Sequence, residues 1–375
     1  MKKICYIVTL PLTIKAFFIP QLKCLADNGF DVAVICSSDN SLQNELGSKI
    51  RYIPIEIPRG ISISGSVWAL KELKDVFKKE KFDLVQYSTP NAAFYSSIAA
   101  KWTGIKVRNY HLMGLRYLGT KGIGRIILKG IEKITCINST HIECVSNSNL
   151  ELGIKERLFK REKATVVWNG STGGVSLKRF NYSNRIEWRN IIRQKLGYTE
   201  DDFVYGFVGR ITRDKGVNEL LTAFSQLQDG SQLLIVGSLE GEKTLEQTLF
   251  QKSLNNSNIK FHKAVIDVEK YYAAIDVLIL PSYREGFGNV IIEAAAMGTP
   301  VIVTDIPGPI DCVEKDITAF VIPVKDSVAL VRSMQKIKNV DYEQMGIKAL
   351  QFVKDRFEEK SLCDYIVKRK KQLLP

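Results

Sequence analysis

Two short segments carry residues whose types suit the binding of a phosphorylated substrate. The first, residues 209–217, places Arg210 at the end of a predicted strand and Lys215 just before a predicted helix. A guanidinium can fork onto two phosphate oxygens, and a lysine ammonium adds a mobile point charge. We expect both cations to converge on a pyrophosphate at one edge of a sheet, although such a pair by itself also suits a basic surface loop.

The second segment, residues 280–300, surrounds a Gly-Phe-Gly turn with two carboxylates. Glu285 precedes the turn, and Glu293 follows it inside the helix that begins near Asn289. Glycine lets backbone amides approach a ligand closely, and the start of a helix favours phosphate. A carboxylate early in such a helix can accept hydrogen bonds from two neighbouring hydroxyl groups. Two carboxylates eight positions apart around this turn therefore indicate a ligand site rather than an ordinary connection.

Together these segments resemble the retaining glycosyltransferases of family 4, which have the GT-B fold. The family's pattern of two glutamates separated by seven residues matches Glu285 and Glu293. Its Gly-Arg-x-x-x-x-Lys-Gly element matches Arg210 and Lys215. The turn-rich stretch at 169–180 is similar to the family's Gly-Val-Asp-x-x-x-Phe linker, with Ser176 in place of the aspartate, so the resemblance covers nearly the whole chain.

The resemblance implies roles for these residues. Arg210 and Lys215 would hold the donor diphosphate and stabilise its departure, and Glu285 would position the sugar. Family members transfer the sugar by front-face attack with retention of configuration, so we assign no enzyme nucleophile or base. Because fixed cations and a helix N-terminus stabilise the leaving group, we expect neither a metal nor a cofactor besides the nucleotide-sugar substrate. The implied donor-binding residues are Gly286, Phe287, Gly288, Asn289, Val290, Glu293 and Val265.

The first half offers two further candidates for substrate contact. Many relatives carry a His-Gly pair after a first-domain strand, whereas here Met113 precedes Gly114. Positions 111 and 113 share one face of a strand, so His111 is a candidate for the catalytic site, with a core histidine as the alternative. Arg116, in the adjoining loop, is a comparable candidate for contact with the acceptor.

The elements that must position these residues alternate between strand-like and helix-like segments, which predicts parallel sheets covered on both faces. A length of 375 residues and an apolar content of 45% suit two globular domains. We predict an α/β protein of GT-B type, with two Rossmann-like doubly wound domains facing a cleft. The first domain would span 1–180, including a linker from 169, and the second 181–355. The tail from Asp341 onward has a helical pattern, and we expect its last part, 356–375, to return to the first domain.

Positive charge concentrates in the first half. Residues 1–180 hold 27 basic and 14 acidic residues, whereas 181–375 hold 26 of each, so the net charge of +13 lies in the first 180 residues. The predicted helix at 122–137 is cationic and amphipathic, and can lie either on an anionic bilayer or on the sheet with solvated lysines. Its candidates for acceptor or membrane contact are Arg125 and Lys129. Scattered cysteines and the lack of an 18-residue apolar run predict a cytoplasmic protein attached peripherally to the inner face of the cytoplasmic membrane.

Softer features favour an acceptor on a polyprenyl-diphosphate carrier. Residues 18–20, Gln86 and the 114–115 loop resemble enzymes that build bacterial O-antigens and capsules. We expect a UDP-linked donor, with an N-acetylhexosamine as the sugar. Two alternatives are a GT-B nucleotide-sugar epimerase, which needs other acid and base residues, and a nucleic-acid-binding protein. The latter lacks a recognisable nucleic-acid module and leaves the motifs unexplained, so we expect no nucleic-acid partner.

Overall fold

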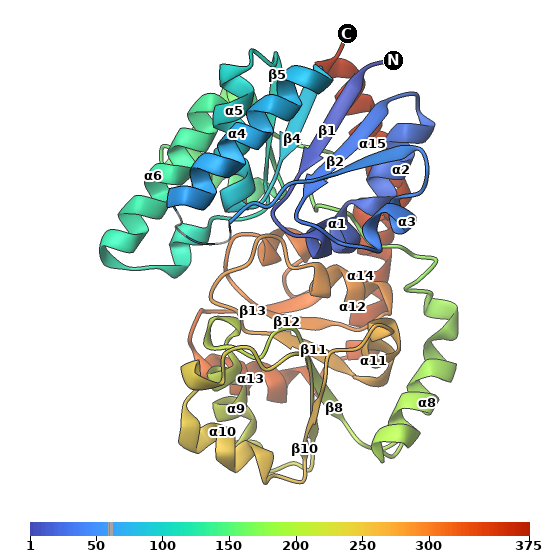
Figure 1. Cartoon of the computed structure of the whole chain (residues 1–375). Coiled ribbons are helices and arrows are strands. Elements are labelled where there is room, and N and C mark those ends of the chain that lie inside the picture. The colour runs from blue at the N-terminus through green and yellow to red at the C-terminus, as the bar shows by residue number, and fades with distance from the viewer. Residues whose placement is uncertain (59, 61–62) are drawn as a thin grey trace. The chain divides into compact units, whose positions relative to one another are not determined.

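The computed structural model describes residues 1–58, 60 and 63–375, and the chain divides into two compact units (Figure 1). The first unit comprises Met1–Gly173 together with Glu359–Pro375, and the second comprises Gly174–Glu358. The boundaries that the sequence placed at 180 and 355 thus lie at 173 and 358 in the structure. Each unit is built around its own parallel sheet, and the two are described separately.

The first unit holds a seven-stranded sheet in the order β3-β2-β1-β4-β5-β6-β7. Chain order runs outward from β1 to β3 and resumes beside β1 at β4, so the topological switch point lies between β1 and β4. The strands are β1 (Lys3–Ile7), β2 (Asp31–Cys36), β3 (Ile50–Pro54), β4 (Leu84–Tyr87), β5 (Val107–Leu112), β6 (His141–Cys144) and β7 (Ala164–Val166). The α-helices are α1 (Pro11–Phe17), α2 (Ile19–Asp27), α3 (Leu42–Leu46), α4 (Ile63–Glu80), α5 (Pro90–Trp102), α6 (Gly122–Asn138), α7 (Asn147–Lys155) and α15 (Glu359–Leu373).

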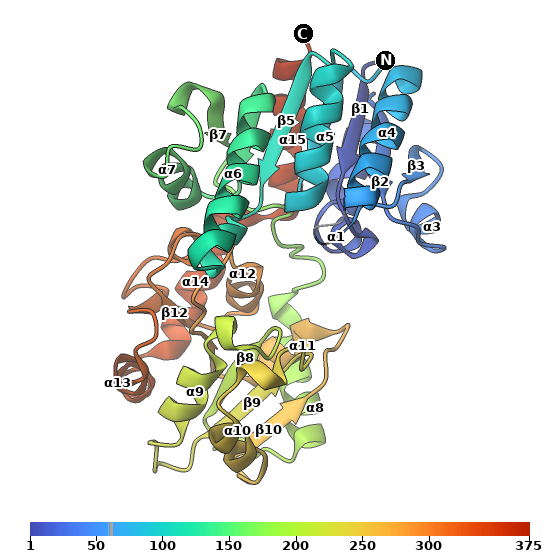
Figure 2. The same ribbon diagram turned by 60° about the vertical axis from the view of Figure 1, so that its left-hand side comes forward.

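Side chains of this sheet alternate between two buried layers because successive residues of a strand point to opposite faces. On β1, Ile4 and Tyr6 belong to the layer of α1, α2 and α15, whereas Cys5 and Ile7 belong to the layer of α4 and α5. Figures 1 and 2 show these helix groups on the two faces of the sheet. Burial on both faces explains why β1 and β2 are nearly continuous apolar runs after their first residue.

The C-terminal helix α15 places a buried lysine against this sheet. Lys370 is 1% exposed, and its ammonium donates to both carboxylate oxygens of Glu143 on β6, at 2.9 and 2.7 Å. It also donates to the side-chain oxygen of Gln86 on β4, at 2.6 Å. Helix α15 is therefore attached to the centre of the first sheet by a charge pair as well as by apolar packing.

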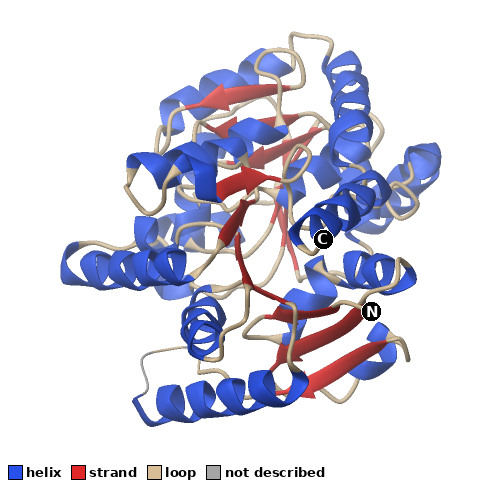
Figure 3. Ribbon diagram, turned by 90° about the horizontal axis from the view of Figure 1, so that it is seen from above, coloured by secondary structure: helices blue, strands red, loops and turns tan. Residues whose placement is uncertain are grey.

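The second unit holds a six-stranded sheet in the order β10-β9-β8-β11-β12-β13, with its switch point between β8 and β11. Helices flank the strands of each sheet (Figure 3), and the predicted α/β fold class is confirmed. The strands are β8 (Val204–Val208), β9 (Gln232–Val236), β10 (Ile259–His262), β11 (Val277–Leu280), β12 (Val301–Thr304) and β13 (Ala319–Ile322). The α-helices are α8 (Arg185–Leu196), α9 (Val217–Phe224), α10 (Gln247–Leu254), α11 (Val268–Ala274), α12 (Asn289–Ala296), α13 (Ser327–Ile337) and α14 (Tyr342–Phe357).

The helical tail expected from Asp341 is interrupted at one residue. Helix α14 ends at Phe357 and α15 begins at Glu359. Glu358 between them is extended, with a ψ of 130°, and forms a parallel bridge with Val175. The interruption therefore comes from pairing with a segment far away in the sequence.

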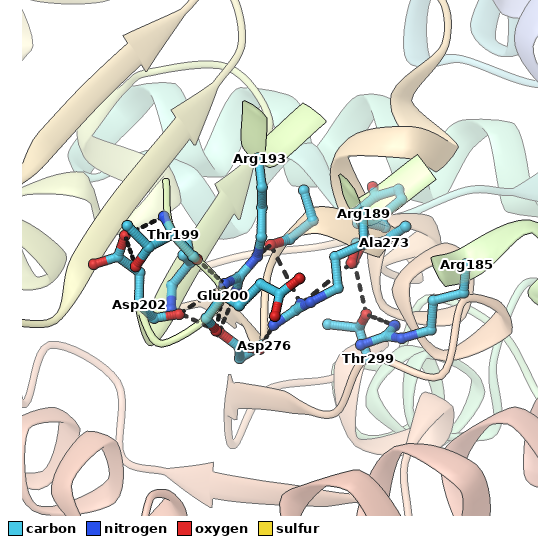
Figure 4. Close-up of polar contacts among 12 residues, drawn as sticks. Arg185, Arg189, Arg193, Thr199, Glu200, Asp202, Ala273, Asp276 and Thr299 are labelled. Carbon is cyan, nitrogen blue, oxygen red and sulfur yellow. Dashed lines mark hydrogen bonds and ion pairs between the residues drawn. The ribbon is translucent and has the colours of Figure 1, made fainter. Parts of the chain in front are cut away.

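Helix α8 is fastened to the amino-terminal edge of the second sheet by an arginine ladder (Figure 4). Arg189 and Arg193 donate to the two oxygens of Asp276, at 2.6 and 2.8 Å, and the backbone amide of Val204 donates to the same carboxylate at 2.7 Å. One turn earlier, Arg185 donates to the Thr299 hydroxyl at 2.7 Å. Asp276 is 3% exposed and precedes β11 directly, so this network lies at the sheet edge opposite the functional motifs.

Candidate active site

The two motif segments of the second unit meet at the switch point of its sheet. Residues 209–215 follow β8, and residues 281–285 follow β11, which is the neighbouring strand. The backbone amide of Tyr283 donates to the carbonyl of Asp214 at 2.9 Å and joins the two loops. Open parallel sheets bind ligands outside the carboxyl ends of the strands at such a point.

Lys215 and Glu285 form an ion pair at this edge. The lysine ammonium lies 2.6 Å from Oε1 of Glu285, and the Ser282 hydroxyl donates to the same oxygen at 2.8 Å. The lysine and glutamate side chains are 17% and 12% exposed, so the pair is mostly shielded from water but reachable. A cation fixed this way can stabilise a developing negative charge without reorganising.

Gly216 allows the two loops to come this close. Its φ is 72°, a left-handed conformation in which side chains are strained. A Cβ added to Gly216 would lie 2.0 Å from the carbonyl oxygen of Pro281. The glycine after Lys215 is therefore a requirement of the Lys215–Glu285 contact.

Arg210 lies in the same charge network but is more exposed. Its side chain is 49% exposed and lies 3.9 Å from a carboxylate oxygen of Asp214 and 3.6 Å from one of Glu240. Arg284 lies 3.3 Å from the same Asp214 oxygen. Burial would raise the pKa of Asp214, but the Thr212 hydroxyl and the charges of Arg210, Arg284 and Lys215 outweigh it and lower that pKa. Asp214 thus gathers three cations around one point, although its charge partly neutralises them.

Helix α12 begins where the sequence placed the phosphate-binding turn. Gly288 is its N-cap with a φ of 104°, and Asn289 is its first residue. Phe287 is not free to contact a ligand with its ring, which is buried and packs edge-on against Phe357 with centroids 5.3 Å apart. Only the backbone of this turn and the half-buried residues Asn289 and Val290 can face a bound molecule.

Glu293 lies in the second turn of α12 and is held by a tyrosine. The Tyr272 hydroxyl, from α11, donates to Oε2 of Glu293 at 2.9 Å. Burial raises the pKa of Glu293, while the Tyr272 hydrogen bond and the Arg179 charge lower it by less. No hydrogen bond to the other carboxylate oxygen occurs among the described residues.

The remaining donor candidate, Val265, is half-buried in the loop after β10, at the carboxyl edge of the outermost strand. Sequence reasoning missed Ser282, Asp214 and Tyr272. The first two lie inside the quoted motifs and carry polar side chains, which is a usable signal. Tyr272 lies in an apolar helix before β11, and nothing local in the sequence connects it to Glu293.

The first unit has a small cavity at the switch point of its own sheet. Thr9 and Thr89 follow β1 and β4, and their hydroxyl oxygens are 2.9 Å apart. Beside them is a cavity of about 170 Å³, also lined by Thr13, Asn91 and Arg116. Arg116 is exposed and has no ion pair within the described part of the chain. The structure thus brings this predicted residue to a place where parallel sheets bind ligands.

His111 lies on β5 and points into an enclosed polar cluster of the first unit. It is 8% exposed, packs edge-on against Phe18, and its Nε2 lies 3.4 Å from the Thr172 hydroxyl. Burial lowers the pKa of His111 to about 4, and the charge of Lys370 acts in the same direction. This is the environment of a core histidine, one of the two alternatives that the sequence left open, and a contact with the donor stays a prediction.

Helix α6 carries the two predicted cations on a different side from its exposed isoleucines. Lys129 lies 2.5 Å and Arg125 3.7 Å from Glu156, and both lie over the Tyr117 ring. The outer side instead presents an isoleucine stripe whose members are 44–76% exposed. Their spacing puts them on one helix face. The stripe consists of Ile123, Ile126, Ile127, Ile134 and Ile137.

Two family models match the chain, one for each unit. "Glycosyltransferase Family 4" matches residues 21–171, and "Glycosyl transferases group 1" matches residues 189–351. The second match contains all of the residues that form the Lys215–Glu285 and Glu293 sites.

Relatives match along almost the full chain. A capsular polysaccharide biosynthesis glycosyltransferase, CapM of Staphylococcus aureus, is 32% identical over 350 residues, covering 92% of this chain and 90% of the relative. An Escherichia coli protein is 26% identical, covering 89% of this chain and 87% of its own length. That protein is named UDP-Gal:alpha-D-GlcNAc-diphosphoundecaprenol alpha-1,3-galactosyltransferase.

Solved structures share the fold at lower identity. Sucrose-phosphate synthase from Thermosynechococcus elongatus superposes with a TM-score of 0.82 at 20% identity, covering 100% of this chain and 99% of the other. HepE from Anabaena, solved in complex with UDP, superposes with a TM-score of 0.80 at 18% identity, covering 99% and 100%. With its family models, its relatives and its two doubly wound units in agreement, the chain belongs to the family 4 glycosyltransferases and has the GT-B fold.

Proposed function

We propose that this glycosyltransferase moves a sugar from a UDP-linked donor to a saccharide on a polyprenyl-diphosphate carrier, in the synthesis of a bacterial surface polysaccharide. The proposed sugar is an N-acetylhexosamine, and the proposed outcome is retention of anomeric configuration. The observation that carries the proposal is the Lys215–Glu285 pair at the β8/β11 switch point, beside the start of α12.

The donor half of the proposal follows from charge. Departure of a nucleoside diphosphate builds negative charge, which Lys215, Arg210 and the amides at the start of α12 would stabilise. Glu285, oriented by Lys215 and Ser282, would accept hydrogen bonds from the sugar. Glu293 would accept from the ribose with the oxygen that Tyr272 leaves unused. These groups supply the positive charge that a metal ion would otherwise provide, so the proposed reaction is independent of metal.

The acceptor half rests on the first unit and on named relatives. Arg116 and the hydroxyls of Thr9 and Thr13 line a cavity with the donor groups that a diphosphate or a sugar needs. The Escherichia coli relative is named for a diphosphoundecaprenol-linked acceptor. A Campylobacter jejuni relative, 26% identical over 81% of this chain, is named N,N'-diacetylbacillosaminyl-diphospho-undecaprenol alpha-1,3-N-acetylgalactosaminyltransferase. Both names support the proposed acceptor class, and the second supports the proposed sugar.

A lipid-linked acceptor places the enzyme at a membrane surface, and the isoleucine stripe of α6 is the surface that we assign to it. Among the helices described here, none is long and apolar enough to cross a bilayer. The stripe exposes five isoleucines, and Lys133 on the same helix and Lys121 just before it are exposed as well. Apolar side chains beside exposed cations suit the interface of an anionic membrane. The proposed location is therefore the inner face of the cytoplasmic membrane.

A donor panel offered with a synthetic polyprenyl-diphosphate sugar tests the function. Transfer from one UDP-sugar is expected, with a product of the same anomeric configuration by NMR, and the rate should persist in EDTA. A strict requirement for a divalent metal would contradict the proposed mechanism. Conversion of the nucleotide sugar into its epimer would favour the epimerase alternative. The proposal would be overturned if the enzyme neither transferred sugar from, nor hydrolysed, any nucleotide sugar of the panel.

A further inference from the structure

The first unit has a second cavity at the amino-terminal edge of its sheet, opposite the edge with Thr9 and Thr89. It is an open depression of about 840 Å³ between the end of α6 and the segment that follows α7. Thr140 and Lys163, the residues just before β6 and β7, line its floor. No residue of this cavity has a role in the proposed transfer reaction.

Four cations line the cavity, and two of them have no ion pair in the described part of the chain. Lys163 caps α6 by donating to the carbonyls of Cys136 and Ile137, at 2.5 and 3.2 Å. Arg161 pairs with Glu151 at 2.6 Å. Arg157 and Lys160 are exposed and lack such a partner. The cavity therefore has two cations that are available for an anionic ligand.

The end of α7 presents Arg157 at the rim of the cavity. Arg157 has a φ of 58°, and the amide of Leu158 donates to the carbonyl of Gly153 at 2.9 Å. This is the hydrogen bond of a Schellman motif, in which the residue after the helix turns into the left-handed conformation. The position of Arg157 is thus fixed by the fold of the backbone rather than by a partner side chain.

Apart from the four cations, Thr140 and the exposed carboxylate of Glu162, the residues that line the cavity are apolar, and this apolar part continues into the isoleucine stripe. Ile137, Ile154, Leu158 and Phe159 line it, and Ile137 is itself 59% exposed and a member of the stripe. Ile134 lies one turn before Ile137 on the same helix face. A molecule with an anionic head in the cavity could therefore lay an apolar chain along the end of α6.

We infer that this cavity binds the headgroup of an anionic phospholipid. Arg157 and Lys160 hold the phosphodiester by charge-assisted hydrogen bonds, and Ile137 with Ile134 contacts the upper part of an acyl chain. A free inorganic phosphate would use the cations but not the apolar wall. The inference rests on the membrane attachment proposed above, but not on the donor, the acceptor or the transferred sugar.

Vesicle flotation tests the site with matched variants. Arg157→Gln/Lys160→Gln is compared with Lys23→Gln/Lys71→Gln, which removes two exposed cations of the same unit that are not among the residues lining this cavity. The measured quantity is the affinity for phosphatidylglycerol vesicles divided by that for phosphatidylcholine vesicles. This ratio should fall about tenfold further in the first variant than in the second, because a basic residue near an anionic surface contributes electrostatic binding free energy. An equal loss of affinity in the two variants would mean that the basic surface attracts the anionic vesicles without a specific site, and it would overturn the inference.

A soluble probe separates the lipid from a plain anion. Dihexanoyl phosphatidylglycerol below its micelle concentration should protect amides of residues 154–163 from hydrogen exchange, whereas inorganic phosphate at the same concentration should not. Equal protection by phosphate would contradict the assignment to a phospholipid. Transfer to a water-soluble acceptor should be unchanged in both double variants. Because binding is measured without any sugar transfer, loss of the lipid site and failure of the proposed function give different results.

Discussion

The ammonium of Lys215 lies 2.6 Å from a carboxylate oxygen of Glu285, although the two residues are 70 positions apart in the chain. The contact links the loops after β8 and β11, and it uses one of the three hydrogens that an ammonium can donate. Lys215 can therefore keep the glutamate oriented while its other hydrogens face a diphosphate. The two motifs thus form one site in which each charge sets the position of the other.

Removing either member of this pair should impair transfer severely. Lys215→Ala and Glu285→Gln should each lower kcat at least about a hundredfold, the loss measured when one preorganised stabilising group is removed from an active site. The fold should survive, because both side chains lie at a loop edge and not in a core. Initial rates at subsaturating and saturating donor separate the effects on kcat and KM.

Arg213→Ala is the control for that experiment. Arg213 is an exposed cation of the same loop, two positions before Lys215. Its variant should keep a rate close to wild type. A rate equally reduced in Arg213→Ala would indicate a general charge effect, and a normal rate in Lys215→Ala would refute its role.

Glu293 and Tyr272 should act together on donor binding. Glu293→Ala should reduce kcat/KM about a hundredfold if two hydrogen bonds to its charged carboxylate, each of about 1.5 kcal/mol, are lost. Tyr272→Phe leaves the carboxylate but not its fixed orientation, so it should raise the KM for donor by a smaller factor and leave kcat nearly unchanged.

The neighbouring tyrosine provides the matched control. The Tyr271 hydroxyl lies 3.1 Å from Nε2 of His262 and not near Glu293. Tyr271→Phe should therefore leave the KM for donor at its wild-type value. An unchanged KM in Tyr272→Phe as well would show that the tyrosine does not position Glu293.

Local sequence patterns predict the fold and the donor motifs because both depend on residues close together in the chain. Alternating strands and helices gave the two parallel sheets, and the Gly-Phe-Gly turn is indeed the start of α12. Contacts between segments that are distant in the chain cannot be predicted from local sequence patterns. The Tyr272–Glu293 bond and the extended Glu358 that divides the C-terminal tail both depend on such contacts.

Helix α6 shows the same limit on a smaller scale. Its helical period is readable in the sequence, but the period does not tell which side packs on the unit. Arg125 and Lys129, the candidates for acceptor or membrane contact, pair with Glu156 at the end of α7, and their contact with the acceptor or membrane stays a prediction. The isoleucines that look like core residues in the sequence are the exposed ones.

The isoleucine stripe should control attachment to vesicles. Ile126→Ser/Ile134→Ser removes two apolar side chains from it, and the vesicle affinity should fall at least tenfold, since burying each isoleucine contributes about 1.5 kcal/mol or more. The control Ile186→Ser/Ile266→Ser changes two isoleucines of the second unit that are 75% and 93% exposed. Equal affinities of the two variants in flotation would show that the isoleucine stripe does not contact the membrane.

Removing one member of the buried Lys370–Glu143 pair should lower the stability of the first unit strongly, whereas replacing both members with apolar residues should lower it little. Lys370→Met leaves the buried Glu143 carboxylate with only the longer ion pair to Arg369, at 3.6 Å, which should destabilise the first unit by about 3 kcal/mol. Adding Glu143→Leu removes that charge and should restore most of the loss. Hydrogen exchange of β4, β5 and β6 peptides reports the local stability. A double variant no more stable than Lys370→Met would contradict this explanation.

Stability should also depend on pH through Glu132, a buried residue of α6. It is 5% exposed and accepts a hydrogen bond from the Tyr110 hydroxyl at 2.6 Å. Burial raises the pKa of Glu132 to about 7, and the Tyr110 hydrogen bond opposes this rise only in part. The folded chain therefore holds this proton over a range in which the unfolded chain has released it.

The sign of the effect follows from linkage. Below the ordinary glutamate pKa both states are protonated, so Glu132 costs nothing there. As pH rises toward 7 the stability falls, and above 7 the folded chain bears a cost of about 3 kcal/mol for the buried charge. Glu132→Gln should therefore raise the urea midpoint at pH 8 and leave it nearly unchanged at pH 4.5.

Two further variants show whether the burial of this one carboxyl group is the cause. Tyr110→Phe removes the hydrogen bond that lowers the pKa of Glu132, so the loss of stability should extend to higher pH. Glu162→Gln changes an exposed glutamate of the same unit and should leave the pH profile as in wild type. A wild-type profile in Glu132→Gln would mean that the pKa of Glu132 is the same in the folded and the unfolded chain, because only a difference between the two makes the stability depend on pH.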